Sequence, residues 1–383
     1  MKGVLIMNFK EVSLAKATIQ TDLLLKNIAA FKQLLSEKTT FMAVIKANAY
    51  GHGAVPLARK MEEAAAANYF GVAQLSEALE LRAGDIQTPI LVFNSMRMEN
   101  IKQAIQQKIT MTVFSKEVAA NIVEIAERLN LTAKVHLKID SGMARLGVTT
   151  FTEVWEVYEA LDSPNVYVEG LYTHFADAYE ETTDSFTHEQ FKRYQEILEQ
   201  FEAKGIHFDI CHTCNTAATI NFPEYHLDMV RVGLGLYGLN PTVGKTREIA
   251  LTPIETIQAM VSHVKDFPAG ESVGYSRTFF SKKPIRIATI AIGYADGIAK
   301  SLSNKGSFTY QGQRLPILGE VCMDQVMLDS TEVENELKVG DMVTYFGNPA
   351  QGDFSAQELA KLADESEYDL LCRIGNRVER IYK

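Results

Sequence analysis

A lysine ends a short apolar run in the stretch AVIKANAYGHG, residues 43–53. The run FMAVI before Lys46 has the composition of a buried strand, and Asn48, Tyr50 and two glycines follow it. A lysine in such a place is either a satisfied surface charge or a reactive amine. A buried amine loses its proton more readily than an exposed one, and it can then form a Schiff base with an aldehyde. The rest of the chain must decide between these interpretations.

Polar residues also follow other short apolar runs. In a parallel barrel, the side chains at the carboxyl ends of the strands are the ones that carry chemistry. The polar residues after these runs include a lysine, two arginines and two histidines, so the predicted site should bind anions. A lysine beside a phosphate site suits pyridoxal phosphate. The residues are Lys46, Tyr50, Asp140, Arg145, His174, His212, Asn215, Thr216 and Arg231, with the backbone N–H groups of Gly233 and Leu234 after them.

Eight apolar runs alternate with amphipathic segments along the first part of the chain. Most of the runs are continuously apolar, as in strands buried on both faces of a parallel sheet. The pattern predicts a (β/α)8 TIM-type barrel. An open doubly wound sheet is the alternative, although no G-x-G-x-x-G follows an early strand. The runs are residues 41–45, 69–73, 90–93, 111–114, 134–139, 168–173, 208–212 and 229–232.

The pattern changes after about residue 244. Strand-like runs separated by Gly, Asn and Pro replace the helical periodicity until SAQELAKLADE. We therefore predict an α/β chain of two domains. A barrel spans residues 1–244 and a C-terminal, mainly β domain spans residues 245–383, with the first residues of the chain allowed to join the β domain.

The composition indicates which partners, location and cysteine chemistry to expect. The chain has 383 residues, 46% of them apolar, and a formal net charge of −10. The negative charge argues against nucleic acid and anionic membranes as partners. No apolar run is long enough for a signal peptide or a membrane span, so we expect a cytoplasmic protein. The four cysteines include a single C-x-x-C, Cys211 and Cys214, and we predict neither a disulfide scaffold nor a metal site.

Nine blocks, in order along nearly the whole chain, resemble bacterial alanine racemase, a pyridoxal-phosphate enzyme. The resemblance implies interconversion of L-alanine and D-alanine with pyridoxal 5'-phosphate, supplying D-alanine for peptidoglycan. A serine or broad-specificity amino-acid racemase is the main alternative. A non-catalytic cofactor carrier and a basic-amino-acid decarboxylase fit the later blocks poorly. The blocks are AVIKANAYGHG, LKIDSGMARLG, EGLYTHFA, CHTCNTAA, VRVGLGLYG, VGYSRTF, IGYADG, EVCMDQ and EYDLLCRIGNRVERIY.

The resemblance implies two catalytic bases. Lys46 would hold the cofactor as a Schiff base and serve as one base, and Tyr275 from the partner subunit of a homodimer would be the other. With a base on each face, the α proton leaves from one side and a proton returns to the other. Met323 and Asp324, also from the partner, would complete the substrate pocket.

The resemblance also implies how the cofactor is held. Arg231 would face the pyridine nitrogen and, as a permanent cation, discourage its protonation. Arg145 would bind the phenolic oxygen and the substrate carboxylate, and a carbamylated Lys138 would brace Arg145. His174 would lie beside Tyr275, and Asn215 would belong to the cofactor site. The phosphate would be held by Tyr50, Thr216, Gly233, Leu234 and Tyr368, whose bulk favours a small substrate side chain.

Overall fold

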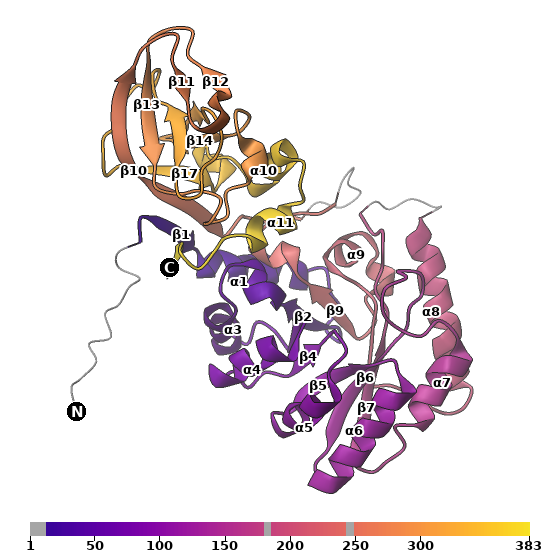
Figure 1. Cartoon of the computed structure of the whole chain (residues 1–383). Coiled ribbons are helices and arrows are strands. Elements are labelled where there is room, and N and C mark those ends of the chain that lie inside the picture. The colour runs from indigo at the N-terminus through magenta and orange to yellow at the C-terminus, as the bar shows by residue number, and fades with distance from the viewer. Residues whose placement is uncertain (1–12, 180–184, 243–248) are drawn as a thin grey trace, which may run out of the picture. The chain divides into compact units, whose positions relative to one another are not determined.

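The computed structural model describes residues 13–179, 185–242 and 249–383 (Figure 1). The described residues form two compact units. The barrel unit contains Leu24–Ala49 and the described part of Ala54–Leu251, and the β unit contains residues 13–23, Tyr50–Gly53 and Thr252–Lys383. The predicted boundary between residues 244 and 245 lies outside the described residues.

The barrel unit is built on eight parallel strands in the order β8-β7-β6-β5-β4-β3-β2-β9. Backbone hydrogen bonds also connect the two ends of this series, because the N–H of Asp228 donates to Cys211 O (3.1 Å) and that of Arg231 to Cys214 O (3.0 Å). The sheet is thus nearly closed, and the predicted barrel is confirmed. The strands are β2 (Thr40–Val44), β3 (Tyr69–Val72), β4 (Ile90–Val92), β5 (Ile109–Val113), β6 (Ala133–Lys138), β7 (Val166–Tyr172), β8 (Ile210–His212) and β9 (Met229–Val232).

Helices alternate with these strands, and several of them begin at capping residues. The hydroxyl of Ser115 caps α6, and Thr150 with Glu153 forms a capping box at the start of α7. Ile122 and Ile125 lie on the buried face of α6. The longer helices are α1 (Thr21–Lys32), α3 (Ala54–Glu63), α4 (Leu75–Ala83), α5 (Met98–Gln106), α6 (Lys116–Leu129), α7 (Phe151–Glu159) and α8 (Phe186–Glu202), followed by the short α9 (Thr216–Asn221). In the described ranges, no helix is long and apolar enough to cross a membrane.

Polar side chains occupy part of the barrel interior. Barrels of this kind are usually filled by branched apolar residues. Here His136 and Lys138 on β6, His212 on β8 and Arg231 on β9 are all buried. Buried charges and imidazoles destabilise a fold unless hydrogen bonds compensate them. Polar groups kept in the barrel interior at this cost indicate a functional role for the interior.

The second unit is mainly β, as predicted. Its longest strand, β10 (Glu255–Phe267), pairs with β1, β13 and β17. β1 (Ala15–Ile19) also runs parallel to β18 (Glu379–Tyr382), so segments from both ends of the chain share one sheet. The other elements are β11 (Ser272–Val273), β12 (Phe279–Phe280), β13 (Ile285–Ile290), β14 (Ser307–Tyr310), β15 (Gln313–Pro316), β16 (Val326–Asp329), β17 (Met342–Phe346), α10 (Ala356–Ala363) and α11 (Glu367–Cys372).

Glu255, at the start of β10, is a buried carboxyl group. Its Oε2 lies 3.6 Å from Nε2 of His52, and neither carboxyl oxygen has a hydrogen-bond partner in the described ranges. Burial raises the pKa of Glu255 above its ordinary value of 4.5, although His52 and Arg380 oppose the shift. Relative to the unfolded chain, the folded chain therefore favours the protonated form of this group.

The substitution Glu255→Gln should make the free energy of unfolding depend less on pH. A carboxyl group with a raised pKa ionises more readily in the unfolded chain, so its contribution to stability is lost as the pH rises from about 4.5 to the folded value. Denaturant unfolding between about pH 4 and about pH 8 would measure the slope. The exposed Glu63→Gln is the control, and equal slopes for E255Q and the wild type would contradict the assignment.

Candidate active site

Lys46 begins a left-handed turn directly after β2. In the segment α2 (Lys46–Tyr50), Ala47, Asn48 and Ala49 have φ between 51° and 54° and ψ between 48° and 50°. The φ of Tyr50 is 53°. L-residues avoid this region at a cost of roughly 1–2 kcal/mol each, and such strain concentrates at functional sites.

Two side chains stabilise this turn. The N–H of Ala47 donates to Oε1 of Glu77 (2.5 Å), and the N–H of Ala54 donates to Oδ1 of Asn48 (2.8 Å). Hydrogen bonds to a carboxylate are among the stronger ones in proteins. They therefore offset part of the backbone strain and fix the main chain that carries Lys46.

Four cationic side chains act on His174, which follows β7. Burial lowers the pKa of His174 well below its ordinary value of 6.5, and the four positive charges lower it further. His174 is therefore neutral near pH 7, and its Nδ1 lies 3.2 Å from Nη2 of Arg231. One end of the barrel thus brings together five predicted site residues. They are His174 and the four cations Arg231, Lys138, Arg145 and Lys46.

Arg231 is a buried cation with a fixed orientation. Its Nη2 donates to Thr173 O and Thr213 O, both at 2.9 Å, and its Nη1 lies 2.8 Å from Nδ1 of His212. The guanidinium also lies 5.4 Å from the centre of the Tyr172 ring. Burial lowers the pKa of Arg231 to about 10, so it keeps its charge at neutral pH.

Lys138 is a buried amine at the end of β6. Its Nζ donates to Ile139 O (3.0 Å) and lies 4.8 Å from the centre of the Tyr172 ring. Burial and the positive charge of Arg231 lower the pKa of Lys138 well below its ordinary value of 10.5, although Asp140 opposes the shift. The amine is therefore more readily deprotonated than an exposed lysine.

Thr216 and Gly233 are in direct contact. The N–H of Gly233 donates to Oγ1 of Thr216 (2.9 Å), and Leu234 follows at the start of the 3₁₀ helix η3 (Leu234–Tyr237). Asn215 caps α9, because its Oδ1 accepts from the N–H of Ala218 (3.0 Å). Four of the predicted cofactor residues thus lie in two neighbouring loops of the barrel unit.

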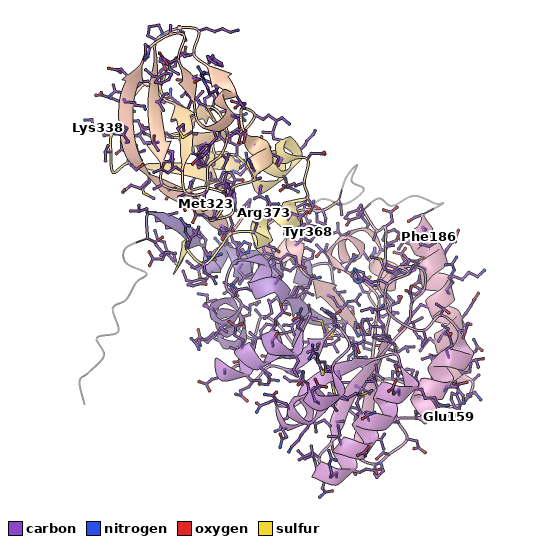
Figure 2. The ribbon with its side chains drawn as sticks, viewed as in Figure 1. Glu159, Phe186, Met323, Lys338, Tyr368 and Arg373 are labelled. Carbon is purple, nitrogen blue, oxygen red and sulfur yellow. The ribbon has the colours of Figure 1, made fainter. Side chains whose placement is uncertain are left out.

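Tyr50 and Tyr368 both belong to the β unit, on which Figure 2 labels Tyr368. Their ring centres are 5.8 Å apart. Burial raises the pKa of Tyr50, so its phenol stays protonated and can donate a hydrogen bond. A Cβ on Gly51, whose φ is +87°, would lie 2.4 Å from Leu371 O, so glycine allows the main chain to approach α11 closely.

Tyr275, Met323 and Asp324 also belong to the β unit. The exposed fractions of Tyr275 and Met323 are 68% and 52%, unusually high for large apolar side chains. Figure 2 shows Met323 on this unit. Oδ1 of Asp324 accepts from Nη1 of Arg377 (2.8 Å). Within a single chain, these side chains are available to another molecule.

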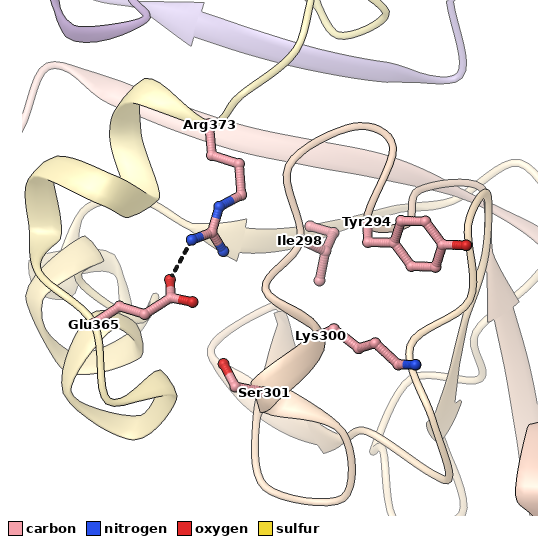
Figure 3. A pocket seen from close by; sticks show the side chains of 6 residues that line it. All are labelled: Tyr294, Ile298, Lys300, Ser301, Glu365 and Arg373. Atoms are coloured by element: carbon pink, nitrogen blue, oxygen red, sulfur yellow. Dashed lines mark ion pairs between the residues drawn. The ribbon is translucent and has the colours of Figure 1, made fainter.

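Two cavities are lined by none of the predicted cofactor or substrate residues, although Asp140, predicted at the rim, lines one of them. One, of about 410 Å³, lies in the β unit, where Arg373 and Glu365 form an ion pair of 2.8 Å (Figure 3). The other, of about 430 Å³, lies at the loop after β6. There the carboxylate of Asp140 accepts from the N–H groups of Gly142, Ala144 and Arg145. Asp140, predicted at the rim, therefore shapes the loop that carries Arg145.

The sequence analysis missed two buried residues of the barrel interior, His136 and Glu169. His136 lies 2.9 Å from His212 (Nδ1 to Nε2) and 3.0 Å from Glu169 (Nε2 to Oε2). The available signal was a polar residue inside each of two apolar runs, KVHLKI and VEGLYT. His212 was placed at the rim without a role.

Family models match most of the chain. The N-terminal domain of alanine racemase matches residues 19–241, and the C-terminal domain of alanine racemase matches residues 254–382. Alanine racemase 1 of Oceanobacillus iheyensis is 41% identical over 364 residues, covering 95% of this chain and 96% of its own. Alanine racemase of Methanococcus maripaludis is 41% identical over 369 residues, covering 96% and 98%.

Solved structures have the same fold. Alanine racemase of Clostridium difficile 630 superposes with a TM-score of 0.92 at 36% identity, covering 97% of this chain and 96% of its own. Alanine racemase from Bartonella henselae, solved with covalently bound pyridoxal phosphate, superposes with a TM-score of 0.85 at 26% identity, covering 97% and 100%.

The left-handed turn makes a prediction about stability. Ala47 is exposed and left-handed, so Ala47→Gly should relieve strain and change the free energy of unfolding by between zero and about 1 kcal/mol in the stabilising direction. The control is Ala120→Gly, exposed in the right-handed helix α6, which should lose roughly 0.5–1 kcal/mol. Denaturant unfolding compares the two, and an equal loss in A47G would show that the turn is not strained.

Proposed function

The chain belongs to the alanine racemase family, and from that premise we propose how its own residues interconvert L-alanine and D-alanine. The activity is that of an alanine racemase, and the substrate is an amino acid. The family's cofactor is pyridoxal 5'-phosphate, which when bound withdraws electrons from the α carbon and makes its proton removable. The chain must then supply binding, orientation and two proton-transfer groups.

The charges at the end of the barrel fit such a cofactor. Lys46, Arg145 and Arg231 all act on His174, and their charges create a positive site for an anionic, phosphate-bearing group. This convergence of Lys46 with two arginines is the observation that carries the proposal. Arg231 would offer a fixed donor to the pyridine nitrogen, and Arg145 would bind the phenolic oxygen and the substrate carboxylate.

Lys46 and Tyr275 are the proposed bases. Lys46 holds or releases the α proton on one face of the substrate, and Tyr275 does so on the other, so the substrate need not turn over. His174 lies beside Tyr275 in this arrangement, and Met323 and Asp324 complete the substrate pocket.

The phosphate is held by hydroxyl and backbone groups in this proposal. Tyr50, Thr216 and Tyr368 supply the hydroxyls, and Gly233 and Leu234 supply backbone N–H groups. The proximity of Thr216 to Gly233, whose N–H would turn from the Thr216 hydroxyl to the phosphate, and the adjacent rings of Tyr50 and Tyr368 support these assignments. Asn215 orients the loop of Thr216 by capping α9.

We further propose a homodimer with shared active sites, located in the cytoplasm and supplying D-alanine for peptidoglycan. The exposure of Tyr275 supports the dimer, because a base in water is poorly placed for proton transfer to a desolvated substrate. In a dimer, Tyr275, Met323 and Asp324 of each chain would be covered by the site of the other.

Mixing two inactive variants tests the shared site. Lys46→Ala and Tyr275→Phe should each lower kcat by at least about 10²-fold, since each removes a proton-transfer group. If Tyr275 acts on the partner's substrate, a mixed dimer has one site with both bases intact, and random mixing restores roughly a quarter of the wild-type activity. A chiral assay of D-alanine measures it after the variants are unfolded and refolded together.

The same mixture can refute the proposal. Activity no higher than that of the separate variants, with mixed dimers present by mass spectrometry, would mean that both bases come from one chain. K46A refolded with the wild type is the control for losses during refolding.

Carbamylation of Lys138 is a separate proposal. A neutral amine adds to carbon dioxide through a new N–C bond and releases one proton, and the resulting carbamate is an anion that Arg145 can bind. The low pKa of Lys138 supports this reaction. Protein kept in isotope-labelled bicarbonate should show one carbamate carbon signal by NMR, and Lys138→Ala should remove it. The control is Lys134→Ala, at a half-exposed lysine, which should retain the signal. A wild-type spectrum without that signal would contradict the proposal.

A further inference from the structure

Polar contacts at hydrogen-bond distance cross the barrel interior from Arg231 to Glu169. Nη1 of Arg231 lies 2.8 Å from Nδ1 of His212. Nε2 of His212 lies 2.9 Å from Nδ1 of His136, and Nε2 of His136 lies 3.0 Å from Oε2 of Glu169. These four side chains, which we call the interior relay, are all buried, and both imidazoles are 0% exposed.

The two ends of the interior relay fix the direction of every hydrogen bond in it. Arginine can only donate, and a carboxylate can only accept. His212 must therefore accept at Nδ1 and donate from Nε2. His136 must likewise accept at Nδ1 and donate from Nε2 to Glu169. Both rings thus carry their single proton on Nε2, and no other arrangement satisfies all three contacts.

The charges agree with this arrangement. Burial alone would raise the pKa of Glu169, but hydrogen bonds from His136 and Lys134 hold it at about 2. Burial lowers the pKa values of His136 and His212, so both rings are neutral at pH 7. The interior relay therefore has one anion, two neutral rings and one cation.

The backbone is shaped to place Glu169 inside the barrel. The register of β6 against β7 shifts between Val135 and His136, which pair with Val168 and Gly170, so Glu169 is the extra residue of a bulge. Bulges re-aim side chains and are frequent beside active sites. At Gly170 a Cβ would lie 2.8 Å from the ring of His136, so glycine makes room for that imidazole.

From this geometry we infer that Glu169 is a positioning residue for the racemase reaction, acting through His136 and His212 to hold the Arg231 guanidinium. The inference rests on the proposed role of Arg231 toward the cofactor. Without an acceptor at Nδ1 of His212, Nη1 of Arg231 would face a second donor and the guanidinium would have to move.

A barrel interior that served stability alone would not need this buried polar network. Replacing a buried polar network by well-packed apolar side chains is often neutral or stabilising. Lys134, whose side chain is 40% exposed, already pairs with Oε1 of Glu169 at 2.7 Å and does not need the two histidines for that contact. The relay is explained by what it does to Arg231.

The substitution Glu169→Gln tests the inference because it can reverse the relay. With Lys134 present, the amide oxygen should face the Lys134 ammonium and the amide nitrogen should face His136, and the Tyr69 hydroxyl, which donates to Oε2 of Glu169 (2.9 Å), would turn to accept from the amide. His136 and His212 would then carry their protons on Nδ1, and His212 would oppose Arg231. Nitrogen NMR of histidine-labelled protein without cofactor should report this change of tautomer, and kcat of the holoenzyme should fall by about 10-fold.

Two further variants separate positioning from general damage. Glu62→Gln is the matched control, since Glu62 is also a hydrogen-bonded carboxylate of the barrel unit with a lowered pKa, and it should leave the tautomers of His136 and His212 unchanged. In the double variant Lys134→Met with Glu169→Gln, the amide oxygen is free to face His136. That variant should recover both the Nε2–H tautomers and most of the lost kcat.

The outcomes are distinct. Unchanged tautomers in E169Q would overturn the relay itself. Changed tautomers with an unchanged kcat would overturn the positioning role and leave the two-base proposal intact. Failure of the two-base proposal is read separately, from the mixture of K46A with Y275F.

Discussion

The burial of the Arg231 charge is the constraint around which the barrel interior is arranged. Removing a guanidinium from water costs several kcal/mol unless its N–H groups are satisfied. Two backbone carbonyls, from Thr173 and Thr213, and the ring of His212 accept these hydrogen bonds. The carbonyls lie just beyond β7 and β8, so the closure of the barrel itself contributes to the compensation. The polar interior follows from this requirement.

Strain after β2 is compensated in a similar way. The left-handed turn raises the energy of the backbone over several residues, and a carboxylate from α4 and an amide within the turn lower it again. The benefit is that Lys46 leaves the strand in one defined direction. A glycine-rich loop would reach the same conformation with less strain. Its greater conformational freedom would leave the Lys46 amine without one defined direction.

Strands and rim residues could be predicted because both follow from local patterns. Continuous apolar runs mark buried parallel strands, and polar residues directly after them lie at one end of a barrel. The inward position of Glu169 could not be predicted, because a bulge changes the face to which a side chain points and a single sequence does not mark it. The left-handed turn was equally hidden, since Ala47, Asn48 and Ala49 include no glycine.

Neutral rings between the charges have an electrostatic consequence. A carboxylate placed directly on Arg231 would fix the guanidinium equally well, but it would cancel most of the positive potential at the barrel end. In the described part of the chain, no acidic side chain forms an ion pair with Arg231, and Glu169 is separated from it by two imidazoles. Glu169 is instead balanced by Lys134. The arrangement therefore holds Arg231 in place and leaves its charge available to an anionic ligand, which a direct ion pair could not do.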